Sequence, residues 1–145
     1  MRLMLSALAL LLAGAAAVPA FADCKGLRID NAWIPEAPPV ATVLAGFASL
    51  SNDSDQPLHI DAVDGADFGG VELHQMSMEG GMMQMRPLHG LDLPAHGSVA
   101  LADGGKHLML MNPKHPFKAG DASLLLFHCG KQATAARFTV KAAQP

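Results

Sequence analysis

The sequence predicts an all-β protein, either a β-sandwich or a small Greek-key barrel. Runs of four to eight residues rich in Val, Leu, Phe and Thr alternate with clusters of Gly, Pro, Asn and Asp, as in short strands joined by turns. No segment keeps a 3.6-residue apolar period over three turns. Short strands at regular spacing are typical of sandwiches and barrels. The predicted strands are Leu27–Trp33, Val43–Ser51, Leu58–Val63, Val71–Met78, Met82–Leu88, Ser98–Leu101, His107–Asn112, Ser123–Phe127 and Ala135–Val140.

Turn-forming residues separate these predicted strands. Pro35, Pro38 and Pro39 mark a loop after the first strand, and Asn112-Pro113 ends the seventh. The fourth and fifth strands are joined by Glu79-Gly80-Gly81. This segment predicts a tight hairpin turn, because glycine adopts positive φ without a steric penalty.

The first 22 residues have the features of a cleaved signal peptide. Arg2 supplies a positive charge, Leu3–Val18 is apolar, and Ala20-Phe21-Ala22 gives the small-x-small pattern of a cleavage site. The apolar run is shorter than the ~20 residues that a membrane-spanning helix needs. We therefore expect residues 1–22 to be removed and residues 23–145 to form the mature protein in the periplasm. An uncleaved membrane anchor is the alternative.

The mature chain contains two cysteines, Cys24 and Cys129. Cys24 lies one residue past the predicted cleavage site, where a lipoprotein would carry its lipid. Lipidation needs a small residue before the cysteine, and Asp23 at that position argues against it. An even number of cysteines in an oxidising compartment predicts a disulfide. Two unpaired thiols, one of them reactive, are the alternative.

The composition predicts a single domain without nucleic-acid partners. Removing 22 of the 145 residues leaves 123, which suits one domain with its own core. Without Arg2, nine Lys and Arg remain against thirteen Asp and Glu, a net charge of −4. No basic patch is present, so nucleic acid is not expected to bind. No repeat, low-complexity segment or linker indicates a second domain.

Methionine is concentrated in one window of the mature chain. All seven of its methionines lie between Met76 and Met111. Successive side chains of a strand point to opposite faces. The strand pattern therefore places His74, Met76 and Met78 opposite the aliphatic side chains of their strand. The predicted strand His107–Asn112 repeats the arrangement, with His107, Met109 and Met111 facing away from its leucines. Met83 and Met85 share a face after the hairpin.

These residues have two interpretations. Methionine in a sheet is usually core packing, and a single histidine is usually a surface or hydrogen-bonded residue. The alternative is a soft-metal site, favoured by two His-x-Met-x-Met ladders on non-aliphatic faces with a Met-rich hairpin between them. Thioether sulfur and imidazole bind Cu(I) and add no negative charge, whereas hard cations prefer oxygen ligands. Because imidazole must be neutral to bind, we expect metal affinity to fall below about pH 6.

The spacing of these residues resembles that of the periplasmic PCu(A)C-type copper chaperones. Their motif is His, ten residues, Met, twenty-one residues, His, one residue and Met. His74, Met85, His107 and Met109 match it without a gap. The flanking segments NAWIPEAPP, LHGLDLPAHGSVAL and GGKHLMLMNP also look similar, so the resemblance covers nearly the whole mature chain.

The resemblance implies a cupredoxin-like β-sandwich or barrel. It also implies Cu(I) binding by His74, Met85, His107 and Met109, and delivery of copper to the copper-site subunit of cytochrome c oxidase. Sco-type thiol proteins are further possible partners. We expect a monomer without a stable membrane anchor and without enzymatic activity. The other methionines are expected to form a hydrophobic collar around the ligands: Met76, Met78, Met82, Met83 and Met111.

Three other functions compete with this one. A blue-copper protein would need a His and a Met after its Cys ligand, and none follows Cys129. A periplasmic copper-buffering or resistance protein would use the same four ligands. A metal-free interaction domain stapled by its disulfide would not depend on them. His128, beside Cys129, and the loop residues His59, His89, His96 and His115 are expected to be surface residues.

Overall fold

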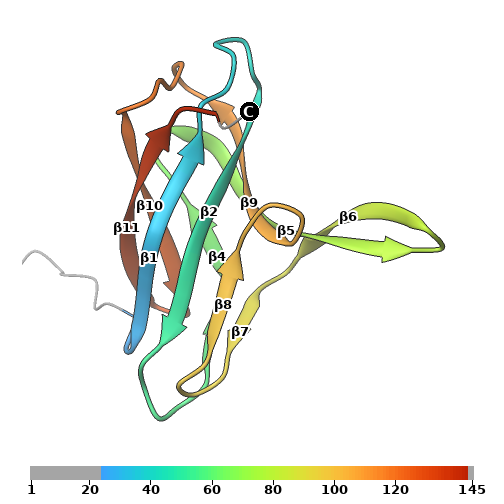
Figure 1. The fold of residues 1–145 in the computed structure, drawn as a ribbon. Helices are drawn as coiled ribbons and strands as arrows, with labels where there is room; N and C mark the ends of the chain where they lie inside the picture. Colours follow the sequence, from blue (N-terminus) through green and yellow to red (C-terminus); the bar gives the residue numbers. More distant parts are fainter. Residues whose placement is uncertain (1–23, 144–145) are drawn as a thin grey trace, which may run out of the picture.

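Eleven β-strands and no helix make up the regular structure of residues 24–143, the part of the chain described in the computed structural model (Figure 1). The predicted signal peptide and its cleavage site lie outside these residues. No helix within residues 24–143 is long and apolar enough to cross a membrane. The strands are β1 (Leu27–Pro35), β2 (Val43–Asn52), β3 (Leu58–Ile60), β4 (Ala62–Asp64), β5 (Phe68–Glu79), β6 (Met82–Leu88), β7 (Leu91–Leu93), β8 (Ser98–Leu101), β9 (Lys106–Pro113), β10 (Ala122–Cys129) and β11 (Gln132–Lys141).

Nine of these strands form one curved sheet in the order β4-β10-β11-β1-β2-β8-β9-β5-β6. Strand β2 pairs with β8 along one half and with β9 along the other, from Val43 to Gly46. Strand β4, at one end of the sheet, packs against β5 near the other end, which closes the sheet into a barrel. The prediction of an all-β barrel is therefore confirmed.

The barrel is filled by the aliphatic and aromatic side chains that the alternating pattern turns inward. On the two strands that matter most for function, Leu73 of β5 and Leu108 and Leu110 of β9 are buried. Phe127 of β10 and Phe138 of β11 stack at 6.3 Å across the same core. The opposite faces of β5 and β9 are consequently left outside the barrel, with their His and Met residues.

The hairpin of β5 and β6 extends away from the barrel as an arm (Figure 1). Gly80 and Gly81 form its two-residue turn with φ of 59° and 79°, as the sequence predicts. The pairing runs without interruption from Glu79↔Met82 to Leu73↔Leu88. We refer to Met76–Met85 as the arm.

The predicted strand Leu58–Val63 is wrong as a single element. It divides at Asp61 into β3, which pairs with β7, and β4, which pairs with β10. Asp61 turns outward, and both of its carboxylate oxygens accept a hydrogen bond from the backbone N–H of Gly130, at 3.0 and 2.9 Å. Strand β7 was not predicted, because its three residues carry too short an alternation to be recognised.

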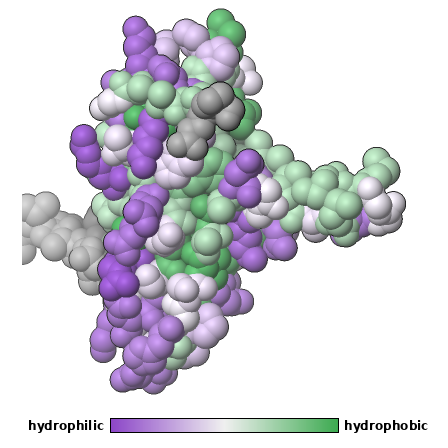
Figure 2. Space-filling view, viewed as in Figure 1, coloured by the Kyte–Doolittle hydropathy of each residue, from purple (hydrophilic) through white to green (hydrophobic). Residues whose placement is uncertain are grey.

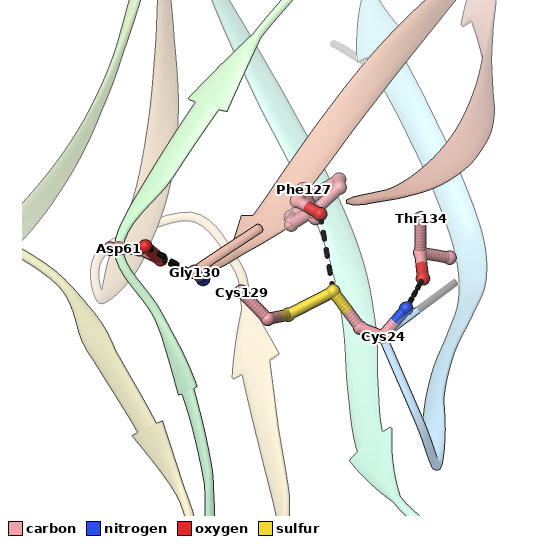
Figure 3. Close-up of a disulfide and its surroundings, with 6 residues drawn as sticks. All are labelled: Cys24, Asp61, Phe127, Cys129, Gly130 and Thr134. Carbon is pink, nitrogen blue, oxygen red and sulfur yellow. Dashed lines mark hydrogen bonds between the residues drawn. A yellow bond between two sulfur atoms is a disulfide. The ribbon is translucent and has the colours of Figure 1, made fainter. Parts of the chain in front are cut away.

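The predicted disulfide between Cys24 and Cys129 is present, with the two Cα atoms 5.9 Å apart and the cysteines separated by 105 positions in the sequence (Figure 3). The Cys24 N–H donates to the Thr134 hydroxyl at 2.9 Å, which holds the start of the described chain against β11. The bond occupies the sulfur atoms of both cysteines. No free thiol is present in residues 24–143.

Candidate metal centre

His74 lies at the centre of the four residues with the motif spacing. It is the direct cross-strand partner of His107 on β9, and their ring centroids are 6.1 Å apart. Glu72↔Met109 is the adjacent same-face pair, so Met109 lies diagonal to His74. On the other side, Met76↔Met85 places Met85 diagonal to His74. Diagonal neighbours are about 7–8 Å apart, within reach of long side chains. The structure therefore gathers all four residues on one face of the sheet.

The imidazole of His74 is held by one nitrogen only. Its Nε2 lies 2.8 Å from the Glu72 carboxylate, which can only accept a hydrogen bond when ionised. A neutral His74 ring must therefore carry its proton on Nε2. The remaining nitrogen, Nδ1, is buried and has no hydrogen-bond partner. A buried nitrogen without a partner costs about 1–3 kcal/mol, so this lone pair calls for a hydrogen-bond donor or a Lewis acid such as a metal ion.

The imidazole of His107 is held in the complementary way. Its Nδ1 lies 3.1 Å from the carbonyl oxygen of Gly105, which is also only an acceptor, so Nδ1 carries the proton. The Nε2 lone pair is left for a ligand. His107 is 8% exposed, because the loop between β8 and β9 folds back beside it. Hydrogen bonds to the second ring nitrogen are the usual device that orients a metal-binding histidine.

The Gly105 carbonyl oxygen also accepts the backbone N–H of Met76 at 3.1 Å. One acceptor therefore fixes both the His107 ring and the base of the arm. Beside it lies a hollow of about 240 Å³. Its lining residues are Ala45, Phe47, Met76, Met85, Asp103, Gly104 and His107.

Met76 and Met85 supply thioethers to this hollow from opposite strands of the arm. Met85 is 47% exposed, whereas Met76 is partly buried. Phe47 forms the apolar wall and packs against Trp33, with ring centroids 5.2 Å apart. The site thus combines two imidazoles and several neutral sulfur ligands with an apolar wall, a donor set suited to a soft cation.

The described residues contain no comparable site for a hard metal ion. Within residues 24–143, no group of three or more His, Cys, Asp or Glu side chains is placed to hold a metal ion. Four of the five histidines predicted to be surface residues are exposed, namely His59, His89, His96 and His115. Two of them pair with single carboxylates, His59 with Asp92 and His96 with Asp55. His128 pairs with Asp64 at 2.6 Å and is 31% exposed. In the part of the chain that the structure describes, two imidazoles adjoin methionines only at His74 and His107.

The other methionines separate into two groups. Met111 lies further along β9, opposite Gly70 of β5 and Val43 of β2, and is partly buried. Met78, Met82 and Met83 lie at the end of the arm and are 64%, 67% and 52% exposed. Figure 2 shows the arm projecting from the barrel with a largely apolar surface and some polar residues on its lower side. The predicted collar therefore applies to Met76, whereas the methionines at the end of the arm do not surround the site.

Fold and side-chain arrangement together define a cupredoxin-like domain of the PCu(A)C class. The chain belongs to the family described as putative lipoprotein LpqE-like, whose model matches residues 27–142. This is the PCu(A)C-like lipoprotein family, so the resemblance seen in the sequence is confirmed. A putative lipoprotein of Leifsonia xyli, Lxx21020, is 28% identical over 99 residues, which are 68% of this chain and 58% of that protein. The chain therefore spans less than two thirds of that relative's length.

Solved PCu(A)C domains share the fold. A copper-bound domain from PmoF2 superposes with a TM-score of 0.69 at 19% identity, covering 85% of this chain and 98% of that one. The apo form of DR1885 from Deinococcus radiodurans gives 0.65 at 26% identity, covering 97% and 95%. Its Cu(I) form gives 0.63 at 28% identity, covering 89% and 83%. The family relationship and its lipoprotein description indicate an exported protein.

The groups that orient the two imidazole rings were not predicted from the sequence. Glu72 could have been found, because a carboxylate two residues before a histidine on a strand lies on the same face. The Gly105 carbonyl could not, since its role depends on how the loop between β8 and β9 closes.

Proposed function

We propose that this protein binds one Cu(I) ion through His74, Met85, His107 and Met109 and carries it to another protein. The observation that supports this most directly is the protonation of the two imidazoles, on Nε2 in His74 and on Nδ1 in His107. Hydrogen bonds to Glu72 and Gly105 leave His74 Nδ1 and His107 Nε2 as free lone pairs beside the thioethers. Two related structures that contain copper, a PmoF2 domain and the Cu(I) form of DR1885, add support.

The ligand set explains both selectivity and release. Two imidazoles and two thioethers are neutral, so the site keeps the single positive charge of Cu(I) and does not attract divalent hard cations. The filled d shell of Cu(I) imposes no strong geometric preference, so a ligand can be exchanged without reorganising the barrel. Met85 is the most exposed of the four and is therefore the ligand that a recipient replaces first.

The recipient we propose is the copper-site subunit of cytochrome c oxidase, in the periplasm, with Sco-type thiol proteins as further partners. The protein acts as a monomeric carrier rather than an enzyme or a membrane-anchored protein. Supporting this, the disulfide occupies both cysteines, so neither provides the thiolate of a blue-copper electron carrier. A copper-buffering protein would use the same site and differ only in the recipient.

Cu(I) titration against a chromophoric chelator tests the binding site. We expect tight uptake of a first equivalent by the wild type and its loss in His74→Ala/Met109→Ala. A matched control, His59→Ala/Met82→Ala, removes one His and one Met elsewhere and should retain that equivalent. Equal binding by all three proteins would reject the site and favour a metal-free interaction domain.

The recipient is tested separately, in cells. Deleting the gene should lower the copper content of cytochrome c oxidase, and the wild-type gene, but not the His74→Ala/Met109→Ala form, should restore it. Normal oxidase combined with greater copper sensitivity would reject delivery and support the buffering role.

A further inference from the structure

The arm has one face made of thioethers and one face that is polar. Met76 and Met78 on β5 oppose Met85 and Met83 on β6 as direct cross-strand pairs. Intervening residues point to the reverse face, where Arg86 forms an ion pair with Glu79 and lies 3.4 Å from Gln84. Met82 is paired with Glu79 and so belongs to the reverse face. The Met face is continuous with the face that carries His74.

The two methionine pairs are of the close type. The Met76 N–H donates to Gly105, on the side away from β6, so Met76 and Met85 form a non-hydrogen-bonded pair. Pairs of this type recur every second residue, which makes Met78↔Met83 another. Cα atoms in such pairs are about 4.5 Å apart and their side chains approach more closely than in hydrogen-bonded pairs. Two thioethers at the end of the arm can therefore reach the same ion.

Packing does not explain why Met78 and Met83, the pair at the end of the arm, are both methionines. Met78 is 64% and Met83 52% exposed, so neither fills the core. An exposed apolar pair next to a turn adds little to folding, whereas two soft, uncharged sulfur atoms suit a monovalent soft cation.

We propose that Met78 and Met83 form a second, weaker site that captures Cu(I) and passes it along Met76 and Met85 to the histidine pair. The proposal rests on the function given above for its destination. Successive pairs are about 7 Å apart along a strand, two residues at roughly 3.4 Å each. Long flexible side chains can hand over an ion across that distance by replacing one sulfur at a time. Thioethers do not titrate, so the capture site keeps its affinity in acid.

The experiment uses Ag(I), a soft monovalent ion that does not change oxidation state, and methionine-methyl NMR. The wild type should take up two equivalents, the second one shifting the methyl signals of Met78 and Met83. Met78→Leu/Met83→Leu should lose the second equivalent and keep the first with unchanged affinity. Met82→Leu, a matched change on the reverse face, should retain both. His107→Ala/Met109→Ala should lose the first equivalent and keep the weaker one.

Acidity and kinetics give two further readouts. The weaker equivalent should bind equally at pH 5 and pH 7.5, unlike the first. Loading of the first site should be slower in Met78→Leu/Met83→Leu although its end point is unchanged. Saturation of the wild type at one equivalent, or equal losses in Met82→Leu, would overturn the capture site and leave the proposed function intact. Equal loading rates would overturn the relay. Absence of the first equivalent would instead reject the proposed function.

Discussion

The Nε2 atom of His74 lies 2.8 Å from the Glu72 carboxylate, on the strand face that carries the four proposed copper ligands. This contact decides which ring nitrogen is free to bind a metal. We predict that Glu72→Ala lowers Cu(I) affinity by about 10- to 100-fold, the usual effect of removing a group that orients a ligand. Glu72→Gln keeps an acceptor for the ring N–H and should lose less.

Competition with a chelator measures this effect. Asp92→Ala removes the carboxylate from the exposed pair with His59 and serves as the matched control, with no expected change in affinity. The same loss in Asp92→Ala and Glu72→Ala would mean that Glu72 acts only through its charge.

Met85 and Met76 line the same hollow, and substitution of each can show which one supplies the sulfur ligand. Leucine has a similar volume but no sulfur, so the substitution removes a ligand with little change in packing. We predict that Met85→Leu weakens binding of the first Cu(I) more than Met76→Leu does. Both variants should unfold within about 1.5 kcal/mol of the wild type in urea. A larger affinity loss in Met76→Leu would show that Met76, rather than Met85, is the sulfur ligand.

Copper affinity should rise with pH through the range in which imidazole loses its proton. A proton on His74 Nδ1 or His107 Nε2 occupies the same lone pair as the ion and therefore competes directly with it. We predict weaker binding of the first equivalent at pH 5 than at pH 7.5, with part of the binding retained because thioethers do not titrate. Equal affinities at the two pH values would count against ligation by histidine.

The disulfide should stabilise the fold without taking part in copper binding. Bridging residues 105 apart restricts the unfolded chain, an effect worth about 4–5 kcal/mol in the chain-entropy model. We predict that Cys24→Ser/Cys129→Ser loses stability of that order in urea unfolding and still binds the first Cu(I). Loss of Cu(I) binding by the folded variant would show that the cysteines contribute to the site.

Asp61 should make stability depend on acidity. The hydrogen bond from the Gly130 N–H, supported by the nearby His59 and His128 rings, lowers the pKa of Asp61 from its usual 3.8. A lowered pKa means that the unfolded chain takes up this proton first as the pH falls. The contribution is therefore present above about pH 4 and is lost as the pH falls through the lower folded-state pKa.

We predict that Asp61→Asn is less stable than the wild type at pH 7 and that the difference shrinks near pH 3, measured by urea unfolding. Asp55→Asn, whose carboxylate contacts the exposed His96 ring, controls for the loss of one charge. A difference that stays constant with pH would show that the charge of Asp61 does not matter.

The sequence was most informative where strand alternation separates two chemistries. Leu73 and Leu108 are buried as predicted, and His74 and His107 lie on the other face because residues two apart on a strand share a face. The strand break at Asp61 could not be foreseen, because it depends on Gly130, which lies 69 residues away in the sequence.

The pairing between strands that are distant in the sequence could not be predicted either. Family spacing indicated that His74 and His107 share a site, but only the register of β5 with β9 shows them directly opposed. The tautomers follow from contacts with Glu72 and Gly105, and no single-strand pattern contains the Gly105 contact.

The Gly105 carbonyl accepts two hydrogen bonds, from the Met76 N–H at the base of the arm and from the His107 ring. The peptide plane of Gly105 therefore works as a pivot. A tilt of the arm that rotates this peptide plane would also turn the His107 imidazole. In the same way, a rotation of the imidazole toward a bound ion would shift the base of the arm. The Gly105 oxygen therefore couples the orientation of the His107 ring to the position of the base of the arm.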